Sequence, residues 1–426
     1  MKFFLQRILT VLARRTLWRY RPFIVGVTGS VGKTSAKEAI FAVLSQKYRV
    51  RKSEKNYNTE IGVPLTILGI PHYGKNIIGW SKAIAGSVVR LIRRDPNYPD
   101  FLVLEMGADH PGDIAQLVRL APPLVGVITA IGEIPVHVEF FSGPKELIEE
   151  KAKLIEALPP EGYAVLNFDD SAVAGMKGRS RGHVLSYGFG NAADVRILQY
   201  RLTSQGIGFS LQHGERAIYI QLKNTFGEHQ AYAAASACAV GLVLNMNLTE
   251  IARGLEKYES PPGRLKILRG NKSSLILDDT YNSSPQAVRA ALEVLREFPA
   301  KRRIAVLGDM LELGSFTEQA HREVGDQVAK SSDIFIGVGE RMKFAIEESM
   351  KPGLNRRALG GHSVSWFSES LAAGKELDRL LRPGDVVLIK GSQSIRMERA
   401  VKEVMSEPER AKELLVRQTV DWERRA

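Results

Sequence analysis

Residues 26–35 read GVTGSVGKTS, and the residues on either side place this stretch between a strand and a helix. The apolar run at 23–27 predicts a buried strand, and residues 35–44 are compatible with a helix. A glycine-rich turn between the two lets backbone N–H groups close on phosphate oxygens, and the helix N-terminus favours negative charge. The stretch therefore predicts a nucleotide-binding loop; the alternative is a tight strand–helix turn with a chance Gly-Lys-Thr.

The loop differs from the standard phosphate-binding pattern. That pattern has Gly six residues before the Lys, whereas Val27 stands there, so a shorter cradle is expected. Lys33 would reach the β- and γ-phosphates of ATP, and the Thr34 hydroxyl would hold Mg²⁺. The residues expected around the nucleotide are Thr28, Gly29, Ser30, Val31, Gly32, Lys33, Thr34 and Ser35.

The composition sets broad limits on function. The 426 residues suffice for two or three domains, and 44% hydrophobic with 25% charged residues is typical of a globular protein. The single cysteine, Cys238, excludes an internal disulfide framework and a Cys-based zinc site. The net charge of +12 suits an anionic ligand, a membrane surface or nucleic acid. Because no recognition motif for nucleic acid is present, we expect no nucleic-acid partner.

The N-terminal segment is strongly basic. Residues 1–37 contain no acid, and apolar residues are interleaved at roughly helical spacing with Lys2, Arg7, Arg14, Arg15, Arg19 and Arg21. The segment lacks the features of a signal peptide and cannot span a bilayer. Two alternatives remain: a helix packed on the protein, or a basic amphipathic helix lying on anionic lipid. The apolar stretch 77–92, followed by Arg93 and Arg94, is either a packed surface helix or a second interfacial contact. The second alternative in each case gives a peripheral membrane contact through residues 1–22 and 77–94.

Strand and helix signals alternate along most of the chain, which predicts parallel sheets covered by helices. Short alternating strands at 182–222 indicate an antiparallel extension. The Pro-Pro-Gly at 261–263 breaks both helix and strand, and a second α/β pattern follows it. We expect a helix at 1–22, a central P-loop ATPase domain with a mostly parallel sheet at 23–262, and a C-terminal Rossmann-like α/β domain at 263–426.

Several candidate functional residues follow predicted strands. Glu105 ends an apolar strand beside the phosphate loop, where a carboxylate can hold Mg²⁺. His137 follows the next strand and is either a hydrogen-bonded structural residue or a ligand. In the second unit Asp279 and Asn282 follow a strand and could contact ribose or purine, while Arg264 could meet phosphate.

These motifs together resemble the Mur ligases, the ATP-dependent amide-forming enzymes of peptidoglycan precursor synthesis. Within that family the chain is most similar to the D-alanyl-D-alanine-adding type. The matching stretches are TGSVGKTS at 28–35, NYNTEIGVPLTIL at 56–68, EMGADHPGDIAQL at 105–117, GEHQAYAAASA at 227–237, GR at 263–264, DDTYNSSP at 278–285, LGDMLELG at 307–314 followed by His321, and GSQSIRMER at 391–399.

The resemblance implies a role for each matching residue. Lys33 and Thr34 would bind ATP and Mg²⁺, Glu105 would bind Mg²⁺, and His137 would help to hold a second Mg²⁺. Lys151, with Lys153 as the rival, matches a lysine that is carbamylated in several members and supports that metal. Arg264 and Asp279 would contact ATP. Next to His229, the usual Asn, an adenine contact, is replaced by Gln230, which offers the same amide groups.

The resemblance also implies a reaction. ATP phosphorylates a carboxylate, an amine attacks the acyl phosphate, and phosphate leaves. We expect a cytoplasmic, monomeric ligase that adds D-Ala-D-Ala to a muramoyl-tripeptide-like acceptor, either free in the cytoplasm or at the inner face of the membrane. The family's usual N-terminal UDP-gripping domain is expected to be missing, because the phosphate loop starts near residue 26. The alternatives are a folylpolyglutamate- or cyanophycin-type ligase and a non-catalytic ATP-binding scaffold at the membrane.

Overall fold

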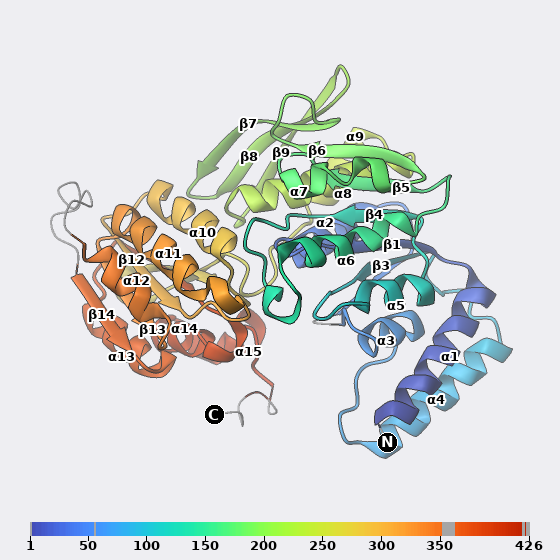
Figure 1. The fold of residues 1–426 in the computed structure, drawn as a ribbon, viewed down its shortest axis with the longest axis horizontal. Helices are drawn as coiled ribbons and strands as arrows, with labels where there is room; N and C mark the ends of the chain where they lie inside the picture. Colours follow the sequence, from blue (N-terminus) through green and yellow to red (C-terminus); the bar gives the residue numbers. More distant parts are fainter. Residues whose placement is uncertain (1, 55–56, 352–362, 420–421, 423–426) are drawn as a thin grey trace.

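The computed structural model describes residues 2–54, 57–351, 363–419 and 422, and the side chains of Lys2 and Phe3 lie outside the described ones. Within these ranges the chain forms two β-sheets, each covered by helices on both faces (Figure 1). This arrangement confirms the predicted α/β class with mostly parallel sheets.

The first sheet runs in the order β2-β3-β1-β4-β5-β6-β7-β8-β9. Its strands are β1 (Phe23–Thr28), β2 (Val50–Lys52), β3 (Phe101–Glu105), β4 (Val125–Ile128), β5 (Tyr163–Asn167), β6 (His183–Gly188), β7 (Val195–Thr203), β8 (Gly206–His213) and β9 (Arg216–Lys223). The pairs from β2 to β7 are parallel, and β7, β8 and β9 pair antiparallel. The predicted antiparallel extension therefore exists but begins at β7, because β6 pairs in parallel with β5.

Helices bury both faces of this sheet. One apolar cluster joins the sheet to α2 (Lys33–Leu44), α8 (Glu228–Val243) and α9 (Leu248–Leu255). The cluster on the other face includes α3 (Gly62–Leu68), α5 (Asp113–Leu120) and α6 (Pro144–Glu156), with the short α7 (Ser171–Ala174) after β5. Strand β1 lies between β3 and β4, so the strand order reverses there. Such a switch point opens a crevice at the carboxyl ends of the strands, where α/β sheets bind ligands.

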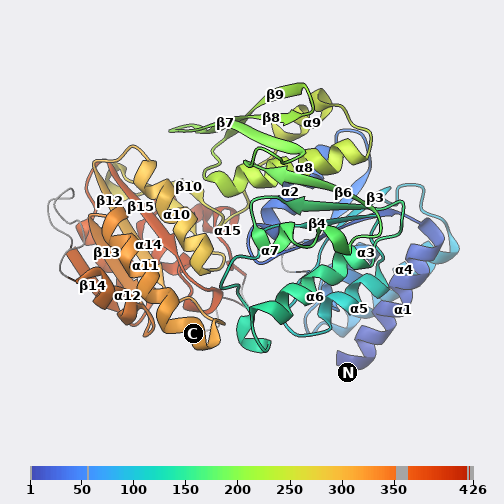
Figure 2. The ribbon, with the colours of Figure 1, turned by 45° about the horizontal axis from the view of Figure 1, so that its top comes forward.

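Helices α1 (Lys2–Tyr20) and α4 (Ile77–Ile92) lie side by side at the end of the first unit farthest from the second sheet (Figure 1, Figure 2). Leu9 and Ala13 on α1 are fully buried in the cluster beneath, and the Tyr20 hydroxyl donates to the Arg90 carbonyl at 2.7 Å. The inner face of α1 therefore packs on the protein, while its outward Trp18 stays 75% exposed. No helix in the described ranges is long and apolar enough to cross a bilayer.

The second sheet follows Pro-Pro-Gly and runs in the order β10-β11-β15-β12-β13-β14. Its strands are β10 (Lys266–Arg269), β11 (Leu275–Asp279), β12 (Arg302–Gly308), β13 (Ile334–Val338), β14 (Ser363–Phe367) and β15 (Asp385–Lys390). All pairs are parallel except β10 with β11. One face packs on α10 (Pro285–Glu297), α11 (Thr317–Ser331) and α12 (Met342–Ser349), and the other on α13 (Ser370–Leu380), α14 (Glu398–Val404) and α15 (Ala411–Leu414).

A buried carboxyl holds the junction between the two sheets. Gly263, with φ of 70°, donates its N–H to Asp278 Oδ2 at 3.1 Å, and the Thr280 hydroxyl donates to Oδ1 at 2.6 Å. Asp278 is fully buried, and burial raises its pKa from 3.8 to about 6. The position of the second unit therefore depends on a group that water does not reach.

We predict that Leu9→Ala lowers the free energy of unfolding by about 2–5 kcal/mol, because it leaves a cavity under α1. The matched control is Val11→Ala two residues away, where the side chain is 49% exposed; it should change stability by less than about 0.5 kcal/mol. Urea unfolding of both variants measures the difference. Equal, small effects would show that α1 does not depend on this packing.

Asp278 predicts a pH dependence of stability. Between pH 4 and 6 the folded state holds the Asp278 proton and the unfolded state does not, so the free energy of unfolding falls as pH rises. A shift to about 6 corresponds to at most about 3 kcal/mol. Asp278→Asn should remove this component. Unfolding of both proteins at pH 4 and pH 7 tests it, and parallel pH curves would contradict it.

Candidate active site

The predicted phosphate loop lies between β1 and α2, at the switch point of the first sheet. The N–H groups of Ser30 and Val31 donate to the Ala130 carbonyl at 2.7 and 3.0 Å, which fixes the loop to the end of β4. Gly29 has φ of 143°, and a Cβ there would lie 2.0 Å from Thr129 Oγ1. Only glycine therefore fits at this position.

Two lysines converge on the carbonyl oxygen of Gly29. Lys33 Nζ donates to it at 2.8 Å, and Lys151 Nζ, from α6, donates to it at 3.0 Å. Lys151 is only 1% exposed, and burial together with the charge of Lys33 lowers its pKa well below the usual value. Burial also lowers the pKa of Lys33, against the opposing effect of Glu105. The structure thus brings two amino groups together at the phosphate loop.

Lys151, and not its rival Lys153, faces the phosphate loop. The Lys153 side chain is 39% exposed, and its Nζ lies 2.5 Å from Glu150 Oε2. Glu150 in turn accepts a hydrogen bond from the Ile114 N–H at 2.8 Å. Lys153 therefore pairs with Glu150, and Glu150 in turn connects α6 to α5.

Thr34 and Glu105 are brought together as the sequence predicted. The Thr34 hydroxyl donates to Glu105 Oε2 at 3.2 Å, and Lys37 Nζ lies 3.5 Å from the same oxygen. Lys37 is 1% exposed and was missed, because a lysine on a helix is usually solvated. One hydroxyl and one carboxylate suit Mg²⁺, which usually completes its shell with phosphate and water. No group of three or more His, Cys, Asp or Glu in the described ranges is arranged to hold a metal by itself.

His137 lies where the two units meet. It has φ of 72° and precedes the 3₁₀ turn Val138–Phe140. Its Nδ1 lies 2.7 Å from Glu312 Oε2 of the second unit, and its Nε2 lies 3.6 Å from Asp109 Oδ1. The hydrogen bond from His137 lowers the pKa of Glu312. His137 thus links the catalytic side of the first sheet to the loop after β12.

His321 supports that loop and takes no direct part in the site. Its Nε2 accepts the Met310 N–H at 3.1 Å, and its Nδ1 lies 2.6 Å from the Thr317 carbonyl. Burial lowers its pKa to about 4, so the ring is neutral at physiological pH. This neutral ring fixes the start of the segment that carries Glu312.

Arg264 connects the linker to the phosphate loop. Its guanidinium lies 3.9 Å from the centre of the Tyr281 ring, and Nη2 donates to Thr34 Oγ1 at 3.3 Å. Asp279 forms an ion pair with Lys390 at 2.7 Å and accepts a hydrogen bond from the Leu265 N–H, which places Asp279 below the cleft.

A cavity of about 310 Å³ lies between the phosphate loop and the second unit. The predicted site residues that line it are Lys33, Glu105, His137, Arg264 and Asn282, and the other lining residues are Ser30, Val31, Asn58, Thr59, Asp109, Val136, Tyr281, Ser283, Ser284, Ala287 and Gln393.

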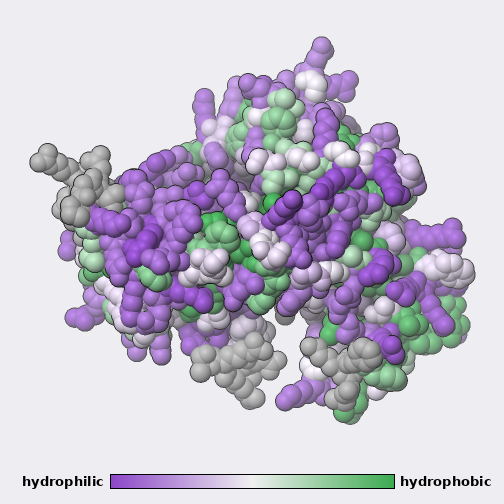
Figure 3. Space-filling view, in the orientation of Figure 1, coloured by the Kyte–Doolittle hydropathy of each residue, from purple (hydrophilic) through white to green (hydrophobic). Residues whose placement is uncertain are grey.

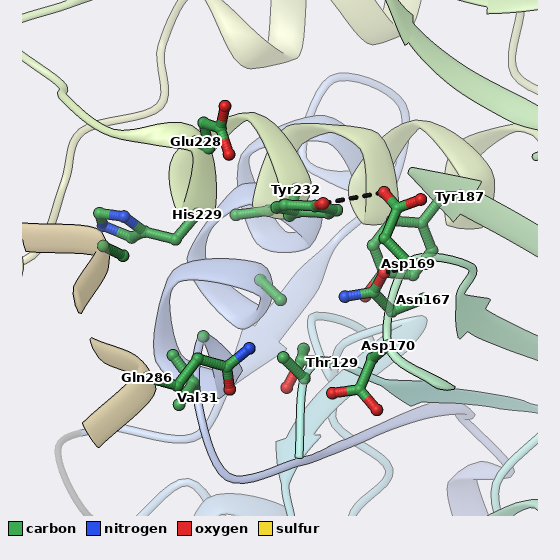
Figure 4. Close-up of a pocket in the computed structure, with 15 residues that line it drawn as sticks. Val31, Thr129, Asn167, Asp169, Asp170, Tyr187, Glu228, His229, Tyr232 and Gln286 are labelled. Atoms are coloured by element: carbon green, nitrogen blue, oxygen red, sulfur yellow. Dashed lines mark hydrogen bonds between the residues drawn. The ribbon is translucent and has the colours of Figure 1, made fainter. Parts of the chain in front are cut away.

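A second cavity of about 210 Å³ lies on the other side of the loop (Figure 4). The Tyr232 ring lies across its upper side, and the Tyr232 hydroxyl donates to Asp169 Oδ2 at 2.8 Å. His229, next to Gln230 in the chain, lies at the same cavity. The remaining residues around it are Val31, Gly32, Ala36, Thr129, Ala130, Asn167, Asp170, Tyr187, Glu228, Ala233, Gln286 and Ala290. The aromatic and carboxyl groups suit a flat, polar-edged ring such as a nucleobase.

The interpretation of Gln230 as an adenine contact is wrong for this structure. Gln230 is fully buried outside both cavities. Its amide donates to Ser260 Oγ at 3.0 Å and accepts from the Tyr258 hydroxyl at 2.5 Å. Its neighbours two positions away, Glu228 and Tyr232, face the cavity, and a helix turns about 200° over two residues. Gln230 therefore points away and holds the linker.

Unpaired polar atoms indicate a polar ligand at this cleft. Within the described structure, buried atoms without a hydrogen-bond partner include Thr28 Oγ1, Ser30 Oγ, Arg264 Nε, Ser283 Oγ and Gln286 Oε1. Buried polar groups in native proteins are normally paired. These atoms surround the loop and its two cavities, so the residues present fit a phosphate-bearing nucleotide.

Besides Lys37, sequence reasoning missed three groups of functional candidates. Asn167 ends β5 and Asp169 lies just after it, so the strand-end argument that found Glu105 could have found both. Asn58 and Gln393 lie in recognised motifs that were given no role. Glu312 also lies in a recognised motif, at 307–314, but only the contact between the two units shows that it pairs with His137.

Comparison with known proteins agrees with this geometry. Residues 27–79 and 84–241 match the Mur ligase middle domain, and residues 263–393 match the Mur ligase glutamate ligase domain. The chain is 31% identical to the UDP-N-acetylmuramoyl-tripeptide–D-alanyl-D-alanine ligase of Synechocystis, covering 92% of this chain and 76% of that protein. It is 28% identical to the Bacillus subtilis enzyme of the same name, covering 93% and 79%.

A solved structure shows the same arrangement. MurF ligase from Thermotoga maritima in complex with ADP superposes with a TM-score of 0.78 at 28% identity, covering 95% of this chain and 84% of that one. The similarity to known Mur ligases, in sequence and in structure, therefore covers both sheets. The chain belongs to the Mur ligase family.

Proposed function

We propose that the protein is an ATP-dependent ligase that adds D-Ala-D-Ala to a muramoyl-tripeptide acceptor. The observation that carries the proposal is the convergence of Lys33, Thr34, Glu105 and Lys151 on one phosphate loop, facing Arg264 of the following unit. The names of the relatives at about 30% identity support this acceptor and this dipeptide.

Different residues assist different parts of the proposed two-step reaction. The acceptor carboxylate attacks the γ-phosphorus of ATP and ADP leaves; the dipeptide amine then attacks the acyl carbon and phosphate leaves. Lys33 and Arg264 stabilise the charge that develops on the transferring phosphoryl group, because both side chains are partly buried and line the same cavity at the loop. The second unit supplies Arg264 and Glu312, so its approach to the first completes the site.

We place Mg²⁺ at Thr34 and Glu105, and a second Mg²⁺ at His137 with Lys151 in support. Metal held by these residues would neutralise charge on the phosphates. His229 and the cavity around Tyr232 would take the adenine, while Asp279 and Asn282 would act from the second unit on the nucleotide. Asp279 would act mainly by holding Lys390, its partner at 2.7 Å.

We further propose that the ligase acts as a cytoplasmic monomer at the inner face of the membrane. The support is the exposed, basic and apolar surface of α1 and α4. A non-catalytic ATP-binding scaffold would share that surface, so turnover decides between the two functions.

The test is a phosphate-release screen of amino acids and dipeptides against UDP-muramoyl peptides, with product mass measured. We expect release only with Mg²⁺ and with D-Ala-D-Ala or a close dipeptide.

Lys33→Ala should lower turnover about 1,000-fold or more while the protein stays folded, because the charge of Lys33 acts on the transition state. Lys330→Ala, on the exposed side of α11, is the matched control. Release with glutamate or folate acceptors instead would identify another ligase of the superfamily, and no release at all would favour the scaffold.

Carbamylation of Lys151 gives a separate prediction. Lys151 is buried beside the phosphate loop, where a carbamate would place two oxygens. Lys151→Ala should be inactive and should regain part of its turnover with acetate or formate, which replace the lost carboxylate. Lys153→Ala is the control and should keep near-normal turnover without rescue. Loss of activity in Lys151→Ala that no carboxylate restores would contradict carbamylation and leave the ligase assignment intact.

A further inference from the structure

The outer sides of α1 and α4 form one exposed apolar surface, called here the α1–α4 face. Eight of the fourteen large apolar side chains exposed in the described part of the chain lie on these two helices. They are Phe4, Val11, Trp18, Ile77, Ile78, Val88, Val89 and Ile92, each 40–75% exposed. Figure 3 shows hydrophobic surface gathered at this end of the molecule. A concentration of this kind marks an interaction site, whereas single exposed apolar residues need no explanation.

The helical spacing shows that the exposure is built into the sequence. Phe4, Val11 and Trp18 recur every seven residues, so they lie on one stripe of α1. Leu9 and Ala13 lie on the opposite, fully buried side. Helix α4 likewise buries Trp80 and Ala83 and exposes an apolar outer side. A helix that is apolar all round is normally covered on all sides. Packing within this chain covers one side only.

The side chains around the α1–α4 face are positively charged, which favours an anionic partner. Residues 1–37 and 61–94 contain no Asp or Glu. Exposed cationic side chains border the apolar residues, among them Arg14, Arg15, Lys82, Arg93 and Arg94. Arginine beside exposed aromatic and aliphatic side chains is the composition of helices that lie in the interface of anionic membranes. A second copy of this face would bring like charges together, which disfavours self-association.

We infer that the α1–α4 face binds the surface of an anionic lipid bilayer, with both helices lying flat in the interface. The inference deepens the proposed membrane location, on which it rests, by naming the surface and its ligand. Helix α4 is about 24 Å long, so it can lie in the interface but not cross the bilayer. The face lies at the end farthest from the second sheet (Figure 1, Figure 2), so bilayer contact leaves the catalytic cleft accessible.

Co-sedimentation of the full chain with vesicles tests the inference. We expect binding to vesicles of phosphatidylglycerol and phosphatidylcholine at low salt, and loss of binding at high salt or with phosphatidylcholine alone. The triple variant Arg14→Gln, Arg15→Gln, Arg93→Gln and the triple variant Ile78→Ser, Val89→Ser, Ile92→Ser should each weaken binding at least about tenfold.

Matched controls change exposed basic or exposed large apolar residues elsewhere on the surface. One control is the triple variant Arg216→Gln, Lys223→Gln, Arg253→Gln, and the other is the triple variant Tyr219→Ser, Met350→Ser, Leu371→Ser. The affinity of each control for anionic vesicles should stay within about twofold of that of the wild type. Phosphate release with soluble substrates is measured on every variant and should not change, so a failure of membrane binding and a failure of the ligase assignment are read separately. Absence of binding to anionic vesicles, equal effects in test and control variants, or a concentration-dependent dimer disrupted by the same substitutions would overturn the inference.

Discussion

The carbonyl oxygen of Gly29 is the point on which the active site depends. It accepts hydrogen bonds from Lys33 and Lys151, and Gly29 can hold this position only because it lacks a Cβ that would meet Thr129. Charging both amino groups at this one neutral oxygen is costly, because burial lowers the pKa of each and the charge of Lys33 lowers the pKa of Lys151 further. An anion in the loop relieves that cost, so the same arrangement that is unfavourable in isolation favours phosphate. The unpaired oxygens of Thr28 and Ser30 lie beside it and point to the same ligand class.

The second unit completes the site through few contacts. Arg264 reaches Thr34, and Glu312 reaches His137, while the buried Asp278 and Gln230 hold the linker between the sheets. The contacts that cross the cleft are partly exposed and individually weak, whereas the linker contacts are buried. The linker therefore fixes where the second unit is attached, and the cleft contacts decide how closely it approaches.

The sequence predicted those features of the protein that depend on residues close together in the chain. The strand, glycine-rich turn and helix around Lys33 and the strand-end carboxylate Glu105 follow from residues next to one another. Lys37 and Glu312 could not be predicted, because their roles depend on burial and on contact between distant segments. Gln230 was misread because the motif gives its position in the chain but not the side of α8 it faces. For α4, hydropathy predicted the helix, but only the structure separates its buried Trp80 from its exposed Ile92.

The distance between the α1–α4 face and the cleft limits how the two can interact. The contacts between the two units are made by Arg264 and Glu312, and neither residue belongs to the cluster that packs under α1. Coupling between sites requires an element that both ligands bias, and the contacts described here provide none between these two ends. Membrane binding would therefore act by raising the local concentration of the enzyme near its acceptor and would leave the rate of the chemical step unchanged. A ligase arranged in this way can keep its catalytic cleft accessible to substrates while its opposite end stays on the bilayer.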